Sequence, residues 1–410
     1  MLALMMWQKR YIREIFSDEI KGIFMFQRTN QILFALLRSV ICNKNLTDTE
    51  LSCYSSELLP ELLKISSKHD IAHLLVLGLK KNSLISKENM SLEQYITKAI
   101  YRYEQIKYEQ ERIYSALEKS QIPFLPLKGT VIRKYYPESW MRTSCDIDIL
   151  VHEEDAEKAV AVLIEKYGYI YHRRTSHDLA LFTPNKIHVE LHYDLVEDGV
   201  ANESSEVLKN VWNTAVVRAG FDFLYDMPDE IYYFYHIAHM AKHFAIGGCG
   251  IRPFIDLWIL DNIKEKNEQK RNGILNQGKL LKFAQEAGNL SKVWFDGVQY
   301  NEISRQMEYF ILKGGVYGSI ENRIMIQQQK KGGRIKYLMS KIFIPYEELQ
   351  YHYPILQKHR WLTPIMEIRR WFKLISVRHA KATIGKVKYN QNISGEKNSS
   401  VEQFLSNIGL

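Results

Sequence analysis

The feature that most constrains this chain is the run Asp146-Ile147-Asp148-Ile149-Leu150-Val151, in which two carboxylates stand two residues apart inside an apolar stretch. Isoleucine and valine favour a strand over a helix. On a strand, residues i and i+2 point to the same face, so Asp146 and Asp148 are predicted to project side by side. Adjacent like charges on a largely buried strand repel and lose hydration, and a divalent cation such as Mg²⁺ relieves both costs. The alternative is an exposed edge strand with two solvated aspartates.

Strand-like runs on both sides of this pair suggest the rest of a small core. Ile122–Leu127 is apolar and punctuated by prolines, as a strand entering a turn is, and a glycine turn at Gly129 follows it. Ile187–Tyr193 alternates apolar and polar positions, which places Glu190 and His192 on one face. Strand, glycine turn, helix, acidic-pair strand and a later strand with a glutamate is the order that a two-metal nucleotidyl-transfer site requires.

Each acidic residue has a defined role in such a site. Asp146 and Asp148 would be shared metal ligands, and Glu190 would complete the site that lowers the pKa of the acceptor hydroxyl. Gly129 has no side chain, so backbone N–H groups and the start of the next helix can approach a triphosphate closely. We therefore predict Asp146, Asp148 and Glu190 as catalytic and metal-binding residues. The predicted cofactor is a pair of Mg²⁺ ions, with Mn²⁺ as a substitute.

The domain organisation follows from length and patterning. A chain of 410 residues suggests two or three units, and 46% hydrophobic content allows a sizeable core. We predict an N-terminal helical region (1–120), a nucleotidyltransferase core (121–196), a C-terminal helical domain (197–380) and a polar tail (381–410) whose low apolar content favours disorder. Within the C-terminal domain, the polar segment 267–278 is predicted to be a loop. The fold class is thus α+β, a small mixed β-sheet core flanked by N- and C-terminal helical regions.

Charge and cysteine usage limit the class of protein. The formal net charge of +8 favours anionic partners such as nucleotides or nucleic acid, although a slightly basic soluble protein accounts for it as well. The four cysteines form neither a CxxC pair nor a zinc spacing, so reduced thiols in a cytoplasmic protein are the simplest account. The N-terminus has no convincing signal peptide and no run reaches the length of a membrane span, so no membrane partner is expected.

Two regions of the C-terminal half carry further candidate residues. His243, Arg252 and Asp256 surround the loop Gly247–Gly250, whose N–H groups at the next helix start can hold an anion, so we expect them to line the cleft. The competing account is helix capping with an Arg252–Asp256 ion pair at i, i+4. Near the C-terminus, aromatic residues amid basic ones suit either nucleic-acid contact or a packed helix with a basic outer face. These aromatic residues are Trp361, Trp371 and Phe372.

The region from Leu127 to Tyr193 resembles the minimal catalytic core of the DNA-polymerase-beta-type nucleotidyltransferase superfamily. More narrowly, it is similar to the bacterial uncharacterised nucleotidyltransferases, which carry KG, a downstream Arg, DID and E-x-H. The likeness extends over most of the chain, from about Ile32 to Ile375. It implies an Mg²⁺-dependent enzyme that moves a nucleoside monophosphate from an NTP to an acceptor hydroxyl and releases pyrophosphate. The matching residues are Lys128-Gly129, Arg142, Asp146-Ile147-Asp148 and Glu190-Leu191-His192.

The turn departs from the superfamily pattern. The usual turn is Gly-Gly or Gly-Ser, whereas Lys128-Gly129-Thr130 stands here, and the spacing from Gly129 to Asp146 exceeds the common one. Lys128 is predicted to supply positive charge to a phosphate, with an exposed lysine at a helix start as the alternative. Arg142 is predicted to clamp a phosphate or to pair with an aspartate of the metal site. The predicted nucleotide-binding residues are Lys128, Gly129, Thr130, Arg142, Ser144, His243, Arg252 and Asp256.

Two other functions stay open on the sequence. Toxin-like nucleotidyltransferases that modify tRNA or a protein resemble this chain in R-x-S-x-D-h-D, which Arg142, Ser144, Asp146 and Asp148 reproduce. The other alternative is a non-catalytic, nucleotide-binding scaffold of the same fold. The predicted partners are therefore an NTP and an acceptor that is a small molecule, an RNA or a protein. The preferred NTP and the oligomeric state are left open.

Overall fold

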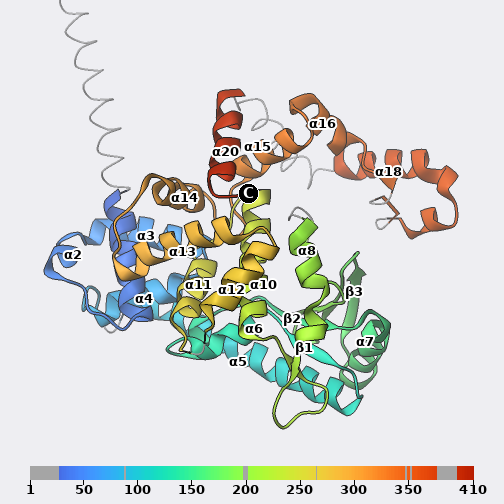
Figure 1. Ribbon diagram of the computed structural model, residues 1–410, viewed down its shortest axis with the longest axis horizontal. Helices are drawn as coiled ribbons and strands as arrows, with labels where there is room; N and C mark the ends of the chain where they lie inside the picture. Colours follow the sequence, from blue (N-terminus) through green and yellow to red (C-terminus); the bar gives the residue numbers. More distant parts are fainter. Residues whose placement is uncertain are drawn as a thin grey trace, which may run out of the picture.

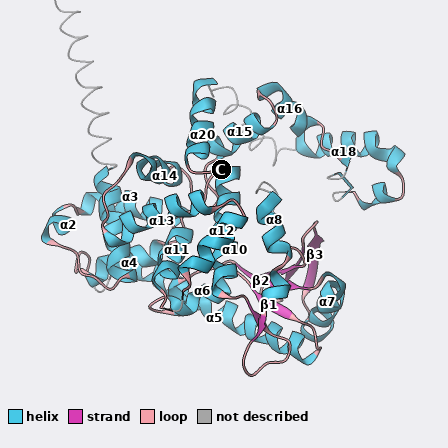
Figure 2. Ribbon diagram, viewed as in Figure 1, coloured by secondary structure: helices cyan, strands magenta, loops and turns pink. Residues whose placement is uncertain are grey.

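The computed structural model describes residues 27–86, 89–196, 202–264, 266–346, 349–350, 353–375 and 395–410. The described part is mainly helical, with one small mixed sheet on the side of α5 and α7 (Figures 1 and 2). Helices precede and follow the strands of this sheet in the sequence. This arrangement confirms the predicted α+β class.

The sheet is built from five strands in the order β1-β2-β5-β4-β3. Strand β2 pairs in parallel with β5, and the other neighbours pair antiparallel. Because β2 has β1 on one side and β5 on the other, it is an interior strand, which excludes the alternative of an exposed edge strand. The strands are β1 (Phe124–Pro126), β2 (Asp146–Val151), β3 (Ile170–Arg174), β4 (Asp178–Phe182) and β5 (His188–His192).

Two helices cover the apolar face of the sheet. The long helix α5 (Met90–Lys119) begins at Asn89, whose side chain accepts a hydrogen bond from the amide of Leu92. Helix α7 (Glu153–Tyr167) follows β2, has three acidic residues in its first turn and ends at Gly168 with φ 69°. Their apolar side chains form one buried cluster with the sheet. Alternate residues of β2 therefore face this cluster, and the aspartates face away from it.

The remaining helices form a second, larger core on the face of the sheet that also carries Asp146 and Asp148. Phe234, Phe244, Phe254, Phe283 and Trp294 are fully buried in it. Before the sheet, helices cover 27–41, α2 (Asp48–Ser52), α3 (Leu59–Lys68) and α4 (Ala72–Lys81), and the single turn α6 (Gly129–Ile132) follows β1. After the sheet come α8 (Asn202–Lys209), α9 (Val211–Thr214), α10 (Asp229–Ile246), α11 (Arg252–Asn262), α12 (Glu268–Gln277), α13 (Leu281–Asp296), α14 (Glu302–Leu312), α15 (Ile320–Lys330), α16 (Arg334–Ile342), α18 (Thr363–Ile375) and α20 (Gly395–Asn407).

The prediction of a loop at 267–278 is wrong, because this polar segment contains α12. Asn267 caps the helix by accepting from the amide of Lys270. Arg271 is buried and donates a 2.7 Å hydrogen bond from Nε to Asp229 of α10. The helix therefore contacts the core through a charged side chain, which hydrophobic periodicity does not detect.

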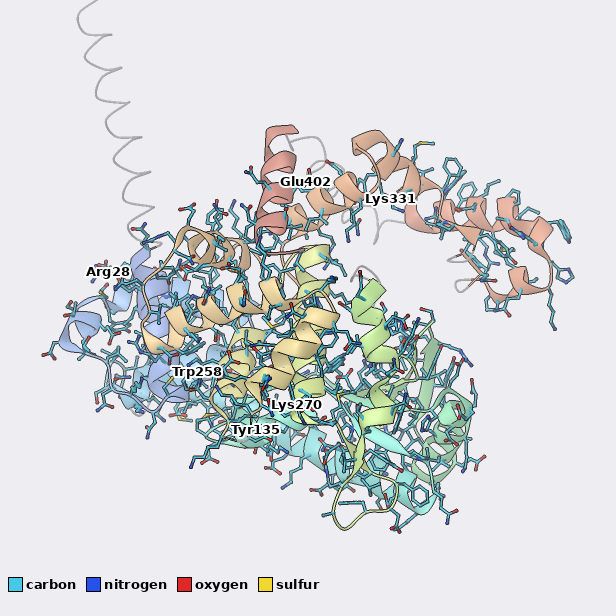
Figure 3. All side chains as sticks on the ribbon, in the orientation of Figure 1. Arg28, Tyr135, Trp258, Lys270, Lys331 and Glu402 are labelled. Atoms are coloured by element: carbon cyan, nitrogen blue, oxygen red, sulfur yellow. The ribbon has the colours of Figure 1, made fainter. Side chains whose placement is uncertain are left out.

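Part of the predicted polar tail forms a helix. Residues 376–394 lie outside the described residues, but α20 packs against α14 and α15 with Phe404 and Ile408 buried. Figure 3 marks this helix by Glu402. Its apolar residues recur at helical spacing (Val401, Phe404, Leu405, Ile408), so a low overall apolar content concealed a short amphipathic helix.

Helix α18 lies on an arm that extends away from the main body together with α16 (Figure 1). Trp371 contacts the rest of the arm, where its indole N–H donates a 2.7 Å hydrogen bond to the carbonyl of Ile342. Trp361 and Phe372 are 71% and 72% exposed, so neither is part of a packed interior. No described helix combines the length and apolar character that a membrane span needs.

Candidate functional site

The strand register brings the predicted acidic residues together. In the parallel β2–β5 pair Asp148 lies opposite Glu190, and Asp146 lies opposite His188. Because side chains alternate along a strand, all four residues share the face that is turned away from the sheet's apolar cluster. Asp148, Glu190 and His192 each offer a ligand atom, and these atoms all lie within 4.8 Å of one another. Carboxylate oxygens and an imidazole nitrogen are suitable ligands for a divalent cation.

Charge coupling gives the two aspartates opposite pKa shifts. Burial alone would raise the pKa of Asp148, but the charge of Lys128 and a hydrogen bond from His192 hold it well below its usual range. The neighbouring charge of Asp148, and then burial, raise the pKa of Asp146. Asp148 is thus held ionised at neutral pH.

Lys128 takes part in the carboxylate cluster. Its Nζ lies 2.7 Å from Oδ1 of Asp148, and Nε2 of His192 lies 3.0 Å from the same oxygen. The backbone of Lys128 has φ 49° and ψ −127°, a conformation that strongly favours glycine. The hydroxyl of Tyr232 donates a 2.8 Å hydrogen bond to the Lys128 carbonyl and supports this turn. The alternative of an exposed lysine at a helix start does not apply, since the ammonium group points at Asp148.

The two turn residues after Lys128 differ in whether they reach the site. Gly129 is buried, and a Cβ there would lie 3.4 Å from Nη1 of Arg142, so the turn packs closely on that side chain. The hydroxyl of Thr130 donates to the carbonyl of Leu127, and Thr130 is not among the residues that line the cavity described below. Of the predicted turn residues, Lys128 and Gly129 are therefore at the site and Thr130 supports the local backbone.

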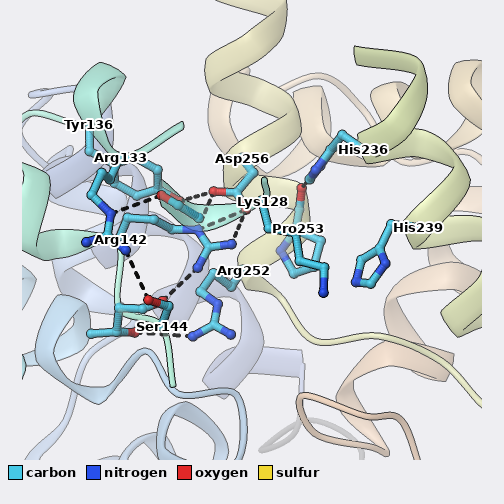
Figure 4. A network of polar contacts seen from close by, with 12 residues as sticks. Lys128, Arg133, Tyr136, Arg142, Ser144, His236, His239, Arg252, Pro253 and Asp256 are labelled. Atoms are coloured by element: carbon cyan, nitrogen blue, oxygen red, sulfur yellow. Dashed lines mark hydrogen bonds and ion pairs between the residues drawn. The ribbon is translucent and has the colours of Figure 1, made fainter. Parts of the chain in front are cut away.

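Arg142 is fully engaged by the protein (Figure 4). Its Nε and Nη2 each lie 2.7 Å from a carboxylate oxygen of Asp256 on α11, and its Nη1 donates to the Thr143 carbonyl. The hydroxyl of Tyr136 also donates to Asp256, at 2.6 Å. Burial favours the neutral form of Asp256, but Arg142 lowers its pKa, so the pair is ionic. The aspartate with which Arg142 pairs is therefore Asp256 and not Asp146 or Asp148.

Arg252 has a different partner from the one expected. Its Nη1 donates to Oδ2 of Asp70 at 2.6 Å and to Oγ1 of Thr143 at 3.2 Å. The predicted alternative of an i, i+4 ion pair between Arg252 and Asp256 is wrong, because Arg142 occupies the Asp256 carboxylate. Ser144 is likewise used within the protein, where its hydroxyl accepts a 3.0 Å hydrogen bond from Arg133.

These residues surround one cavity of about 300 Å³ between the sheet and helices α10 and α11. His243 belongs to its wall and lies 3.0 Å from His239, Nε2 to Nε2. The structure therefore brings together every predicted site residue except Thr130. The predicted residues on the wall are Lys128, Gly129, Arg142, Ser144, Asp146, Asp148, Glu190, His243, Arg252 and Asp256.

Several lining residues were missing from the predicted set. His192 shares the face of Glu190 on β5, and the strand alternation that placed them together was sufficient to include it. Tyr232 and Tyr235 come from α10 and Tyr317 from a loop after α14, and no local pattern indicates that they reach this cavity. His69, at the end of α3, also lines it.

His69 is fully buried and neutral. Its Nδ1 accepts the amide hydrogen of Ile251 at 3.3 Å, which leaves the proton on Nε2, and Nε2 has no hydrogen-bond partner among the described residues. Burial, and then the charge of Lys68, lower the pKa of His69 from 6.5 to about 4.

This shift predicts a pH dependence of stability. Between pH 6.5 and about 4 the unfolded state binds a proton that the folded state excludes, so the free energy of unfolding falls as the pH falls. The slope attributable to His69 is about 1.4 kcal/mol per pH unit in that window. Asparagine can place an oxygen where Nδ1 accepts from Ile251 and does not titrate. Urea unfolding at several pH values should show a flatter profile for His69→Asn, and parallel profiles would contradict the prediction.

The comparison with protein-family models agrees with this geometry. No curated protein is significantly similar to this chain. The solution structure of the antibiotic-resistance factor ANT(2'')-Ia is 10% identical, with a TM-score of 0.25, and the match covers 48% of this chain and 91% of that one. The family model described as uncharacterised nucleotidyltransferase matches residues 55–296, which include every predicted site residue. The chain therefore belongs to this family of uncharacterised nucleotidyltransferases.

Proposed function

We propose that this protein is an Mg²⁺-dependent enzyme that transfers a nucleoside monophosphate from an NTP to an acceptor hydroxyl and releases pyrophosphate. The observation that carries the proposal is the β2–β5 register, which sets Asp148 opposite Glu190 with Asp146 on the same face. Membership of a nucleotidyltransferase family supports the reaction class.

The residues present fit a bound divalent cation. Carboxylate oxygens of Asp148 and Glu190 and the Nε2 of His192 converge within 4.8 Å, and oxygen-rich sets of this kind suit Mg²⁺ or Mn²⁺. Asp148, Glu190 and His192 would hold the cation, and Asp146, on the same face of β2, would be a further ligand. When bound, such a cation neutralises phosphate charge and lowers the pKa of an attacking hydroxyl. The low pKa of Asp148 keeps this ligand ionised at neutral pH.

The protein's own groups have separate tasks in this proposal. Lys128 places a positive charge next to Asp148, where the triphosphate of the NTP would lie along the Lys128-Gly129 turn. Arg142 and Asp256 hold the turn and strand β2 against α11, and so position the site rather than contact the nucleotide. The acceptor would enter from the side of α10, whose Tyr235, His239 and His243 line the opposite wall.

The experiment that tests the proposal is incubation of the full chain with each of four α-labelled NTPs and Mg²⁺ or Mn²⁺, in the presence of bacterial RNA, protein and small-molecule extracts. We expect label in one acceptor class and equimolar pyrophosphate. Label in RNA or protein would identify the toxin-like alternative, whereas label in a small molecule would exclude it. NTP binding by calorimetry without label transfer in any fraction would favour the non-catalytic scaffold and contradict the enzyme.

A further inference from the structure

Positively charged side chains already contact the carboxylate cluster. Lys128 donates to Asp148 at 2.7 Å, and Nη2 of Arg173 lies 3.4 Å from Oε1 of Glu190. His192 bridges the two carboxylates, with Nε2 at 3.0 Å from Asp148 and 3.5 Å from Glu190. Lys128 and Arg173 thus each compensate one of the acidic side chains, before any metal ion binds.

The Lys128 ammonium occupies a position beside the ligand oxygen itself. Oδ1 of Asp148 receives both Lys128 and His192, and a cation bound to this oxygen would compete with Lys128 directly. Two positive charges a few ångströms apart in a partly buried site repel each other strongly. The Tyr232 hydroxyl fixes the backbone of Lys128 at this turn, and the ammonium group lies 2.7 Å from Asp148.

The backbone conformation shows that this lysine is held at a cost. Lys128 has φ 49° and ψ −127°, a conformation that a glycine would adopt without strain. A strained non-glycine residue persists only where surrounding contacts over-determine it, and here the contact is the pair between its ammonium group and Asp148. The contact of the ammonium group with Asp148, and not the backbone conformation, therefore explains why a lysine occupies this position.

We propose that the Lys128 ammonium takes the place of one of the two cations of a two-metal site, so that this protein binds a single divalent cation. The proposal rests on the proposed function for the identity of the cation. It replaces the pair of Mg²⁺ ions expected from the sequence with one ion and a built-in positive charge. Lys128 would thereby keep the apo site folded and would define the number of metal ions in the loaded site.

The test is a titration of the full chain with Mn²⁺ alone, in which electron paramagnetic resonance measures free Mn²⁺. We expect at most one Mn²⁺ per wild-type chain. In Lys128→Met, which removes the charge and shortens the unbranched side chain by one atom, we expect Mn²⁺ to bind at least about tenfold more tightly, or a second ion to bind. Lys128→Arg is the matched control, because it keeps the charge and should bind Mn²⁺ like the wild type.

Lys128→Gly separates the effect of the lost charge from a folding defect. Glycine suits the backbone conformation of the turn and also removes the ammonium group. Thermal unfolding gives a second readout: Mn²⁺ should raise the melting temperature of the Met and Gly variants more than that of the wild type. Two Mn²⁺ ions per wild-type chain, or Met and Gly variants that neither bind Mn²⁺ more tightly than the wild type nor bind a second ion, would overturn the proposal. The number of bound Mn²⁺ ions is measured without NTP. It can therefore be interpreted whether or not nucleotidyl transfer is found.

Discussion

Replacement of Asp148 by asparagine is expected to abolish nucleotidyl transfer, with a loss of more than about 100-fold, the upper range for residues that only support metal ligands. Asp148 lies at the centre of the cluster, where Lys128, His192 and the bound cation would all share its carboxylate. An amide of the same shape has no charge to attract a cation. The measurement is the initial rate of pyrophosphate release with the acceptor found in the labelling experiment.

Glu154→Gln provides the matched control for this prediction. Glu154 is an exposed carboxylate on α7 that does not line the cavity, so the same chemical change there should leave the rate unaltered. Circular dichroism of Asp148→Asn should show a folded chain, so that a loss of rate reports on the reaction. A folded Asp148→Asn protein with wild-type rates would show that the carboxylate pair takes no part in the reaction. That outcome would contradict the proposed function.

The second large effect is expected at the Arg142–Asp256 pair. Arg142→Met leaves the Asp256 carboxylate buried, with the Tyr136 hydroxyl as its remaining hydrogen-bond donor among the described residues (Figure 4). Breaking a buried ion pair from one side costs about 3–5 kcal/mol, because the other charge stays in a medium that solvates it poorly. Urea unfolding followed by far-UV circular dichroism should show this fall in the free energy of unfolding.

An exposed ion pair supplies the comparison. Lys64 and Glu61 on α3 are 59% and 40% exposed in their side chains, so Glu61→Gln should change stability by less than about 1 kcal/mol. The double variant Arg142→Met/Asp256→Leu should recover much of the loss, since no buried charge is left. If Arg142 were a phosphate clamp instead, Arg142→Met would unfold like the wild type and lose nucleotide affinity. That outcome would contradict the structural role.

Local patterns in the sequence were sufficient to predict which polar side chains of the strands share a face. Alternation has a period of two residues, so Asp146 with Asp148, and Glu190 with His192, can be assigned to common faces without knowledge of the fold. The order of the elements around Gly129 then indicated the reaction class. The same reasoning identified Lys128 as a source of positive charge at the turn, and the structure adds its contact with Asp148.

Contacts between distant segments could not be read in this way. Arg142 and Asp256 are 114 residues apart, and the helical spacing of Arg252 to Asp256 suggested the wrong partner. Helix α12 is held by a buried arginine whose partner Asp229 lies on another helix. In both cases the stabilising contact is a charge pair, whose position depends on the folded chain and leaves no periodic signal in the sequence.

The sequence by itself determined that this protein has an acidic pair on a strand, a glycine turn before it and a glutamate on a later strand. These features are local, because strand geometry alone decides which side chains share a face. Only the tertiary structure decided that β5 lies beside β2, that Lys128 bonds to Asp148, and that Arg142 pairs with Asp256. Burial makes those charge pairs strong and specific, and burial is a property of the packed chain.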